Sequence, residues 1–548
     1  MENSANIATS LSRMAQLQPD TAAVIMAGTR GPGRRISYRE LDNASDRIAC
    51  GLREVGIGAG TRTVLMVRPS HDFFTLAFAL FKIGAVLVAV DPGLGFRNLG
   101  QCLKEAKPLA FIGIPQAHLA RVLFRWGAAS IKFNIVTGSL GVTGILDLAR
   151  IREIGKGNQP GPLAPTDPRT PAAILFTSGS TGAPKGVLYT HGNFAAQIRA
   201  LQQEFAIQPG EIDLATFPLF ALFAPALGMT SVIPAMDFTK PGRVDPRRIL
   251  DPVRRYGVTN LFGSPALLDR VGGWAKPRGI KLTGLRRVLS AGAPVHARIM
   301  ELFCSLLDPG AQVFSVYGAT ESLPLSSIGS DEVLSSTSHL TGQGKGVCVG
   351  RPVNGLQVGI IAITDKSIPV WRDALSLPVN DIGEFIVRGP QVTQAYYNDQ
   401  SATALSKIYL DDGSWYHRMG DLGYLDEQGR LWFCGRKSQR VETGDQTLYS
   451  IPCEGVFNTH PDVYRSALVG VPACGPLRRP VICVELERTA RRKDRSEIRD
   501  ELLSLGAGVS HTRQIRDVLF HDHFPVDIRH NAKIDRDRLS RWAEVRLG

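Results

Sequence analysis

Short runs of apolar and β-branched residues recur along this chain, and most are apolar throughout instead of alternating with polar residues. Clear examples are residues 63–67, 85–91, 109–114, 172–178 and 259–264. Strands that are apolar on both sides are typical of sheets covered by helices on both faces. Because helical patterns separate these runs, the sequence predicts an α/β fold with largely parallel sheets. In such sheets, ligands bind at the carboxyl ends of the strands.

The pattern of apolar residues changes near Asp381. Residues 382–389 and 423–435 have the pattern of antiparallel strands. Within the second segment, residues 426–429 have the composition of a hairpin turn. We therefore expect a smaller antiparallel β subdomain beside the mostly parallel sheets.

A third pattern occupies the end of the chain. Residues 466–473 and 479–487 predict strands, and residues 496–508 predict a helix. We expect a large α/β N-terminal domain with stacked sheets over residues 1–437. A small, mobile α+β C-terminal domain would follow on a hinge, over residues 438–548.

Length and charge narrow the classes of protein to consider. A chain of 548 residues and 59.4 kDa is too long for one compact core, which favours two or more domains. The net charge of +13 fits either a nucleic-acid binder or a basic surface that handles acidic small molecules. The charge is not concentrated in a tail, so we favour small molecules and expect no nucleic-acid partner.

Residues 73–90 approach membrane-spanning length, but Lys82 and Gly84 interrupt them and residues 91–93 end the stretch. We expect a buried helix, a turn and a buried strand there, and no integral membrane segment. Residues 1–16 lack the basic start and apolar run of a signal peptide. The eight cysteines are scattered singly without a CxxC pair. These features predict a cytoplasmic protein with free thiols.

The strongest local signal is the segment 177–186, directly after a predicted buried strand. Three glycines and four hydroxyl residues in ten positions offer backbone N–H groups, hydroxyls and one ammonium to a polyphosphate. The spacing is not that of a Walker A loop. The candidate nucleotide-binding residues in it are Thr177, Ser178, Gly179, Ser180, Thr181, Gly182 and Lys185.

This segment resembles the phosphate loop of the acyl-adenylate-forming superfamily, which includes acyl-CoA synthetases, firefly luciferase and peptide-synthetase adenylation domains. Further motifs resemble that family in the same order, at residues 290–294, 317–321, 420–421, 435–436 and 531–534. The resemblance covers nearly the whole chain and implies binding of ATP and Mg²⁺. It adds these candidate nucleotide-binding residues: Gly292, Ala293, Pro294, Tyr317, Gly318, Ala319, Thr320, Asp421, Arg436 and Lys533.

The resemblance also implies individual roles. Tyr317 would stack on adenine, Asp421 would accept hydrogen bonds from the ribose hydroxyls, and Glu321 would hold Mg²⁺. Physical chemistry agrees, because attack of a carboxylate on the α-phosphate of ATP requires neutralised charge and close positioning. The candidate catalytic residues are Lys533, Lys185, Thr320 and Glu321.

The step after adenylation depends on the segment 435–445. Relatives that transfer the acyl group to coenzyme A usually carry a lysine where this chain has Glu442. The usual hinge Asp or Lys corresponds to Ser438. A carboxylate would repel a second phosphorylated substrate, which argues against thioester formation.

Residues 217–237, 261–268 and 435–443 resemble a narrower group, the β-lactone synthetases of bacterial long-chain olefin biosynthesis. That resemblance implies adenylation of a 2-alkyl-3-hydroxy fatty acid, followed by attack of its own β-hydroxyl and release of AMP. The apolar residues 217–229 suit a long acyl chain, although core packing explains them about as well. The resemblance also implies a thiolase, a reductase and a β-lactone decarboxylase as pathway partners.

Other functions remain to be distinguished. One alternative is a long-chain fatty acid ligase that makes an acyl-AMP or acyl-CoA. Another is a non-catalytic acyl or nucleotide sensor, which would be expected to have lost Lys185, Glu321 or Lys533, and all three are present. A dinucleotide-dependent oxidoreductase is disfavoured because no G-x-G-x-x-G motif follows a strand with an acidic residue at the required distance.

Overall fold

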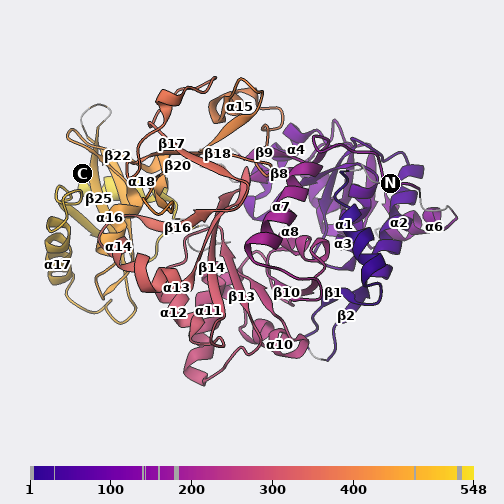
Figure 1. Cartoon of the computed structure of the whole chain (residues 1–548), viewed down its shortest axis with the longest axis horizontal. Coiled ribbons are helices and arrows are strands. Elements are labelled where there is room, and N and C mark those ends of the chain that lie inside the picture. Colours follow the sequence, from indigo (N-terminus) through magenta and orange to yellow (C-terminus); the bar gives the residue numbers. More distant parts are fainter. Residues whose placement is uncertain are drawn as a thin grey trace.

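A computed structural model describes residues 5–29, 31–138, 141, 144–157, 161–177, 184–473, 475, 477–526 and 534–548. It has a large N-terminal α/β domain with mixed sheets and a smaller C-terminal domain, as the sequence predicts. The two termini lie toward opposite ends of the long axis of the molecule (Figure 1). The precise domain boundary, expected after Lys437, stays a prediction.

The first sheet has seven strands in the order β7-β6-β5-β3-β4-β8-β9. Its neighbours pair in parallel except for β8 and β9, which are antiparallel. The expected buried helix and strand in residues 73–90 are present as α3 and β4. The strands are β3 (Arg62–Met66), β4 (Val86–Ala89), β5 (Ala110–Gly113), β6 (Phe133–Val136), β7 (Leu146–Asp147), β8 (Pro171–Thr177) and β9 (Lys185–Thr190). The helices of this region are α1 (Thr9–Leu17), α2 (Tyr38–Glu54), α3 (His71–Lys82), α4 (Phe96–Ala106), α5 (Pro115–Leu123), α6 (Leu148–Lys156) and α7 (His191–Glu204).

The second sheet has fourteen strands, and their pairing changes from mostly parallel on one side to antiparallel on the other. Its parallel part contains β1 (Ala22–Met26), β10 (Ile212–Ala215), β11 (Thr230–Ile233), β12 (Asn260–Phe262), β13 (Arg287–Ala291) and β14 (Gln312–Ala319), with β2 (Arg34–Ser37) antiparallel at the edge. Helices of this part are α8 (Pro218–Ala221), α9 (Phe223–Ala226), α10 (Arg247–Tyr256), α11 (Pro265–Ala275), α12 (Ala297–Cys304), α13 (Ser330–Glu332) and α14 (Ser338–Gly342).

The predicted antiparallel strands are present and continue this second sheet. β16 pairs with β15 through Ser327 and Arg351, and with β21 through Val347 and Phe433. The sheet therefore continues from β14 of the parallel part through β15 and β16 to β21. The antiparallel elements are β15 (Ser322–Gly329), β16 (Val347–Pro352), β17 (Gln357–Ile361), β18 (Gly383–Arg388), β19 (Lys407–Tyr409), β20 (Trp415–Leu425) and β21 (Leu431–Arg436), with the helix α15 (Gln400–Ser406).

The C-terminal part has its own three-stranded sheet, in the order β24-β25-β26. Val441 and Leu448 are buried in its apolar core together with Leu468 and Ile482. In Figure 1 this yellow part lies at one end of the molecule, beside α14 and β16. Its elements are β22 (Val441–Glu442), β23 (Thr447–Leu448), α16 (Ser450–Phe457), β24 (Val463–Pro472), β25 (Arg478–Leu486), α17 (Arg495–Ala507), β26 (Asp517–Phe520) and α18 (Arg536–Leu547).

A local signal fixes the start of α7 directly after β9. The side chain of Thr190 accepts a hydrogen bond from the backbone N–H of Asn193, and the Asn193 side chain accepts one from the Thr190 backbone. This reciprocal capping satisfies two N–H groups that the first helical turn leaves without partners. The side chain of Asn193 also donates to the carbonyl of Pro390 at 3.0 Å, which ties α7 to the segment after β18.

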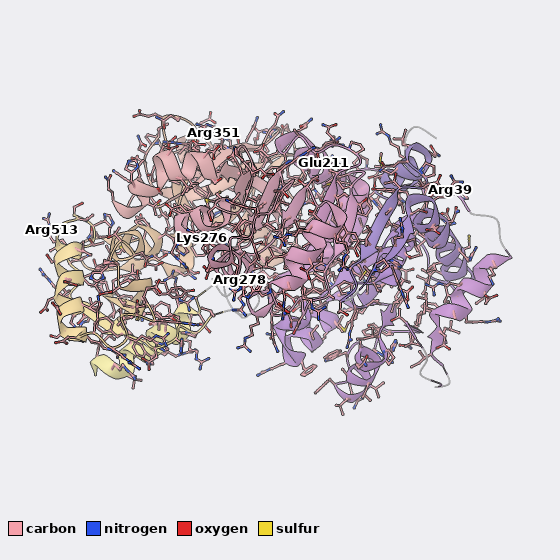
Figure 2. All side chains as sticks on the ribbon, turned by 90° about the horizontal axis from the view of Figure 1, so that it is seen from below. Arg39, Glu211, Lys276, Arg278, Arg351 and Arg513 are labelled. Carbon is pink, nitrogen blue, oxygen red and sulfur yellow. The ribbon has the colours of Figure 1, made fainter. Side chains whose placement is uncertain are left out.

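The basic residues labelled in Figure 2 do not gather in one place. Arg39, Lys276, Arg278, Arg351 and Arg513 are spread from one end of the molecule to the other (Figure 2). Within the described residues, no helix combines the length and the apolar character that crossing a membrane requires. The seven cysteines that the structure describes carry free thiols.

Candidate active site

A cavity of about 1590 Å³ lies where strands of both large sheets end. Asp91 and Ile114 line it from the first sheet, directly beyond β4 and β5. Thr216 and Gly292 line it from the second sheet, directly beyond β10 and β13. The cavity therefore occupies the carboxyl ends of parallel strands, where the sequence predicts ligand binding.

The cavity brings together most of the predicted site residues that the structure describes. Thr177 ends β8 directly opposite Lys185 on β9. Residues 178–182 and Lys533 lie outside the described residues, but Ile534, the neighbour of Lys533 in sequence, lines the cavity. The predicted residues found in the lining are Lys185, Gly292, Ala293, Pro294, Tyr317, Gly318, Ala319, Thr320, Glu321, Asp421 and Arg436.

The turn after β13 depends on Gly292. Its φ of +91° lies in the region that favours glycine, because a side chain there would be strained. The turn carries Ala293 and Pro294 into the cavity wall. Residues with short side chains therefore form this part of the cavity wall.

Asp421 is the centre of a charged cluster at one side of the cavity. It is 2% exposed and lies on β20, where it is paired in register with Arg436 of β21. Tyr317 donates its hydroxyl to one carboxylate oxygen at 2.5 Å, and Arg436 approaches the other at 3.0 Å. Burial, followed by the nearby Asp421 charge, raises the pKa of Tyr317 well above its ordinary value, so the phenol stays protonated and donates.

Glu321 is positioned by two neighbours that arrive from the segment after β18. Tyr396 donates its hydroxyl to Glu321 Oε1 at 2.6 Å. The backbone N–H of Thr393 donates to the Glu321 carbonyl at 2.9 Å. The ammonium of Lys185 lies 5.4 Å from the centre of the Tyr396 ring, within cation–π range. Tyr396 thus links the predicted metal ligand to the predicted phosphate-binding lysine.

A buried lysine, Lys407, bonds to the same segment as Glu321 does, through the backbone of Thr393. Lys407 is 1% exposed and donates its ammonium to the carbonyl of Thr393, which also accepts from Trp415 Nε1 at 3.2 Å. Burial lowers the pKa of Lys407 to about 7, an effect that the negative charge of Glu321 partly opposes. Lys407 therefore acts on the site through Thr393.

Thr320 is held through its backbone. Tyr189 on β9 donates its hydroxyl to the Thr320 carbonyl, and Gln197 on α7 donates to Tyr189 at 3.2 Å. The same Gln197 amide donates to the carbonyl of Leu323 at 2.9 Å. The segment 317–321 is thereby anchored to the elements that follow the predicted phosphate loop.

The other half of the cavity is apolar, and α8 and α9 supply much of its wall. Phe220 packs edge-on against Phe262, with ring centres 4.8 Å apart, and against Phe217 at 5.0 Å. Ala221 and Ala224 point into the protein core instead, at 0% and 3% exposure. The segment 217–229 therefore serves both of the purposes considered for it, cavity wall and core. Its cavity-lining residues include Phe217, Leu219, Phe220, Leu222 and Phe223.

A family model described as AMP-binding enzyme matches residues 11–397. The chain belongs to the AMP-binding enzyme family. An olefin β-lactone synthetase of Xanthomonas campestris is 48% identical, over 98% of this chain and 97% of that protein. One of Stenotrophomonas maltophilia is also 48% identical, over 100% of this chain and 99% of that protein. This AMP-binding enzyme is accordingly an AMP-forming ligase that uses ATP.

Solved structures of the same fold agree over nearly the whole chain. The amide bond synthetase McbA of Marinactinospora thermotolerans superposes with a TM-score of 0.80 at 23% identity, over 98% of this chain and 99% of that one. ATP-bound MatB of Rhodopseudomonas palustris gives a TM-score of 0.79 at 22% identity, over 100% of both chains. At these identities the likeness establishes the fold.

A network of ion pairs joins the segment after β21 to β18. Glu384 on β18 is 1% exposed and accepts from Arg418 at 2.5 Å and from Lys437 at 3.1 Å. Arg440 pairs with Asp365 at 2.7 Å. These contacts fix the direction in which the chain leaves β21.

Sequence reasoning missed several residues of this network and of the cavity. Tyr189, Tyr396, Glu384, Arg418 and Lys407 belong to none of the five motifs. Tyr396 lies between Gly389-Pro390, with residues 391–395 in between, and Tyr397-Asn398. These flanking residues are at most a weak signal for a turn. The others sit in strands, and only the pairing of those strands brings them to the site.

The charged half fits a Mg²⁺ ion that a nucleotide would share. Glu321 offers a carboxylate at the cavity wall, and carboxylate oxygen is a preferred ligand of Mg²⁺. Among the described residues, no group of three or more His, Cys, Asp or Glu could hold a metal ion. One carboxylate with phosphate oxygens and water suits Mg²⁺, which rarely relies on an all-protein cage.

Proposed function

We propose that this enzyme adenylates a 2-alkyl-3-hydroxy fatty acid and closes it to a β-lactone, with release of AMP and pyrophosphate, in long-chain olefin biosynthesis. The observation that carries the proposal is the 48% identity, over nearly the full length, to two olefin β-lactone synthetases. The cavity supports it, because an apolar half suited to alkyl chains adjoins a charged half suited to a nucleotide.

In the first step, the carboxylate of the acid attacks the α-phosphorus of ATP. The bond from that phosphorus to the oxygen bridging to the β-phosphate breaks, and pyrophosphate leaves. Lys533 orients the carboxylate, Lys185 neutralises phosphate charge, and Thr320 faces the phosphates. Mg²⁺ held at Glu321 would supply further neutralisation of phosphate charge when bound.

The cluster around Asp421 would bind the nucleoside. Tyr317 stacks on adenine while its hydroxyl remains bonded to Asp421, whose carboxylate accepts from the ribose hydroxyls. Arg436 holds that carboxylate in place through an ion pair. The same three residues thus position the α-phosphate by fixing the base and the sugar.

In the second step, the β-hydroxyl oxygen attacks the acyl carbonyl carbon. The bond from that carbon to the AMP oxygen breaks, and the hydroxyl proton passes to water or to the released AMP phosphate as the four-membered ring closes. Ring closure would depend mainly on orientation of the hydroxyl by the cavity and on AMP as a good leaving group.

The segment 435–445 supports an internal acceptor over a thiol cosubstrate. Glu442 is half exposed and pairs with Arg440 at 2.8 Å. A carboxylate here, where thioester-forming relatives usually carry lysine, disfavours a phosphorylated thiol. The internal hydroxyl makes such a cosubstrate unnecessary.

The proposal includes an organisation for the whole chain. Residues 1–437 form the adenylating domain, and residues 438–548 form a mobile domain that brings Lys533 to the cavity. The enzyme would act in the cytoplasm, in a complex with the thiolase, reductase and β-lactone decarboxylase of the same pathway.

The test compares two acids that differ only in the β-hydroxyl. With MgATP and no coenzyme A, the 2-alkyl-3-hydroxy acid should give many turnovers of pyrophosphate per enzyme. The matched acid without the hydroxyl should give about one turnover, because its acyl-AMP has no internal nucleophile. Equal turnover of both acids, or turnover that needs coenzyme A, would contradict lactone formation.

A further inference from the structure

An exposed apolar face lies outside the cavity, on α5. Leu119, Val122 and Leu123 follow the spacing i, i+3, i+4 and therefore share one side of the helix. They are 70%, 62% and 72% exposed, whereas Ala117 and His118 are buried on the other side. Single exposed apolar residues are ordinary, but a contiguous group marks an interaction site.

Aromatic rings extend this face to α4. Phe124 follows α5 and Phe96 begins α4, and their rings stack with centres 5.0 Å apart and an angle of 17°. The nearly buried Trp126 stacks against Phe124 at 5.7 Å and holds the pair in place. We name the group of Phe96, Leu119, Val122, Leu123 and Phe124 the α4–α5 patch.

Two exposed arginines adjoin the α4–α5 patch in the sequence. Residues 91–132 contain six Lys or Arg and two Asp or Glu. Arg97 and Arg125 are exposed and are sequence neighbours of Phe96 and Phe124. Salt bridges within the described part of the chain do not include either arginine. Exposed apolar and aromatic side chains beside exposed arginines complement the apolar layer and the anionic headgroups of a lipid surface.

The α4–α5 patch is also close in the chain to the cavity wall. Asp91 and Ile114 line the cavity, and Phe96 and Leu119 each follow five residues later. A long-chain acid dissolves in a lipid layer and not in water. An enzyme resting on that layer through the α4–α5 patch would have the acid beside its cavity.

We propose that the α4–α5 patch docks this enzyme on an anionic lipid surface. The docking is peripheral: apolar side chains enter the headgroup region, and Arg97 and Arg125 pair with lipid phosphates. A second copy of this chain is the alternative occupant, and the experiment distinguishes the two. The proposal extends beyond the lactone-forming reaction; its link to a long-chain acid rests on the proposed function, whereas the exposed apolar and basic residues of the patch do not.

The experiment measures co-sedimentation of the full chain with vesicles, without ATP or acid. Vesicles contain phosphatidylglycerol with phosphatidylcholine, or phosphatidylcholine alone. The variant Leu119→Ser/Leu123→Ser removes two apolar contacts, and Arg97→Gln/Arg125→Gln removes two charges. The matched control, Leu17→Ser/Val545→Ser, alters two other apolar residues that are 64% and 81% exposed.

The wild type should bind the anionic vesicles, with at least tenfold weaker binding to phosphatidylcholine alone or in high salt. Both patch variants should lose at least tenfold in partition coefficient, and the control should match the wild type. Wild-type binding that is absent, or that the patch variants retain, overturns the proposal. The wild type could instead fail to bind vesicles and form a concentration-dependent dimer that only Leu119→Ser/Leu123→Ser abolishes. That result would assign the patch to a second copy of the chain and would also overturn the lipid proposal. Pyrophosphate release, assayed separately with a detergent-dispersed acid, shows whether adenylation itself is intact.

Discussion

At the scale of single residues, neighbouring side chains hold the two carboxylates of the cavity, Asp421 and Glu321, in fixed orientations. Asp421 receives a phenol from Tyr317 and a guanidinium from Arg436, so its carboxylate is held in one orientation. Glu321 receives the Tyr396 phenol in a similar way. Two carboxylates with fixed directions are what a nucleoside and its metal-bound phosphates require.

Asp421→Asn tests the role of the first carboxylate. The amide loses its charge toward Arg436, and we expect the KM for ATP to rise at least tenfold, which is about 1.4 kcal/mol. The KM for the acid should change little. Steady-state pyrophosphate release with each substrate varied in turn measures both constants.

Tyr317→Phe is the matched control for Asp421→Asn. It keeps the aromatic ring and the charge of Asp421 and removes a hydroxyl that bonds to Asp421, so the KM for ATP should rise less than it does in Asp421→Asn. A larger effect on the acid than on ATP in either variant would contradict the nucleoside role.

Lys407 makes the stability of the protein depend on pH. Its pKa is about 7 in the folded protein and roughly 10.4 in an unfolded chain. Between these values the unfolded state binds the extra proton, so the free energy of unfolding should rise with pH, by up to about 1.4 kcal/mol per unit. Lys407→Met should flatten this rise between pH 7.5 and 9 in urea titrations.

The exposed Lys366→Met serves as the control for that substitution and should leave the pH dependence as it is in the wild type. A slope that Lys407→Met does not change would show that Lys407 binds the same number of protons in both states.

At the scale of elements, strand pairing gathers residues that are far apart in sequence. Glu384 on β18, Arg418 on β20 and Lys437 after β21 meet because these three strands are neighbours in the sheet. The resulting ion pairs hold the segment that follows β21 against β18. Glu384 and Arg418 are nearly buried, which makes removal of one partner costly.

Glu384→Gln should therefore destabilise the protein by about 3 kcal/mol, because it leaves Arg418 charged and buried without its carboxylate. Glu332→Gln makes the same chemical change at a partly exposed glutamate that pairs with Arg351 at 3.3 Å and with Arg430 at 3.5 Å, and it should cost less than about 1 kcal/mol. Denaturant unfolding measures both values. Equal destabilisation by the two variants would show that burial of the Glu384 pair is not the cause.

Elements with strong local patterns could be predicted from the sequence. The run 73–90 gave α3 and β4 correctly because its apolar residues are interrupted at Lys82 and Gly84. The hairpin of β20 and β21 followed from the turn residues between Asp426 and Gly429. Tyr396 and Lys407 could not be found in this way, since neither carries a local pattern and only tertiary pairing brings them to Glu321.

At the scale of the whole molecule, we propose that one cavity binds the substrates for both adenylation and ring closure. Ile534 and Arg536 line it from the C-terminal part of the chain. Lys533 directly precedes Ile534, and we therefore propose it as the catalytic cation. Lys533→Ala should lower pyrophosphate release at least a hundredfold while ATP binding, measured by calorimetry, stays within a few-fold. Unchanged pyrophosphate release would contradict the assignment of Lys533.

The most direct measurement is identification of the product, by mass spectrometry and NMR, from MgATP and a 2-alkyl-3-hydroxy fatty acid without coenzyme A. We expect a β-lactone, with one AMP and one pyrophosphate formed per lactone. If only acyl-AMP accumulates, and added coenzyme A converts it to a thioester, the enzyme is a thioester-forming ligase and the interpretation of Glu442 is wrong.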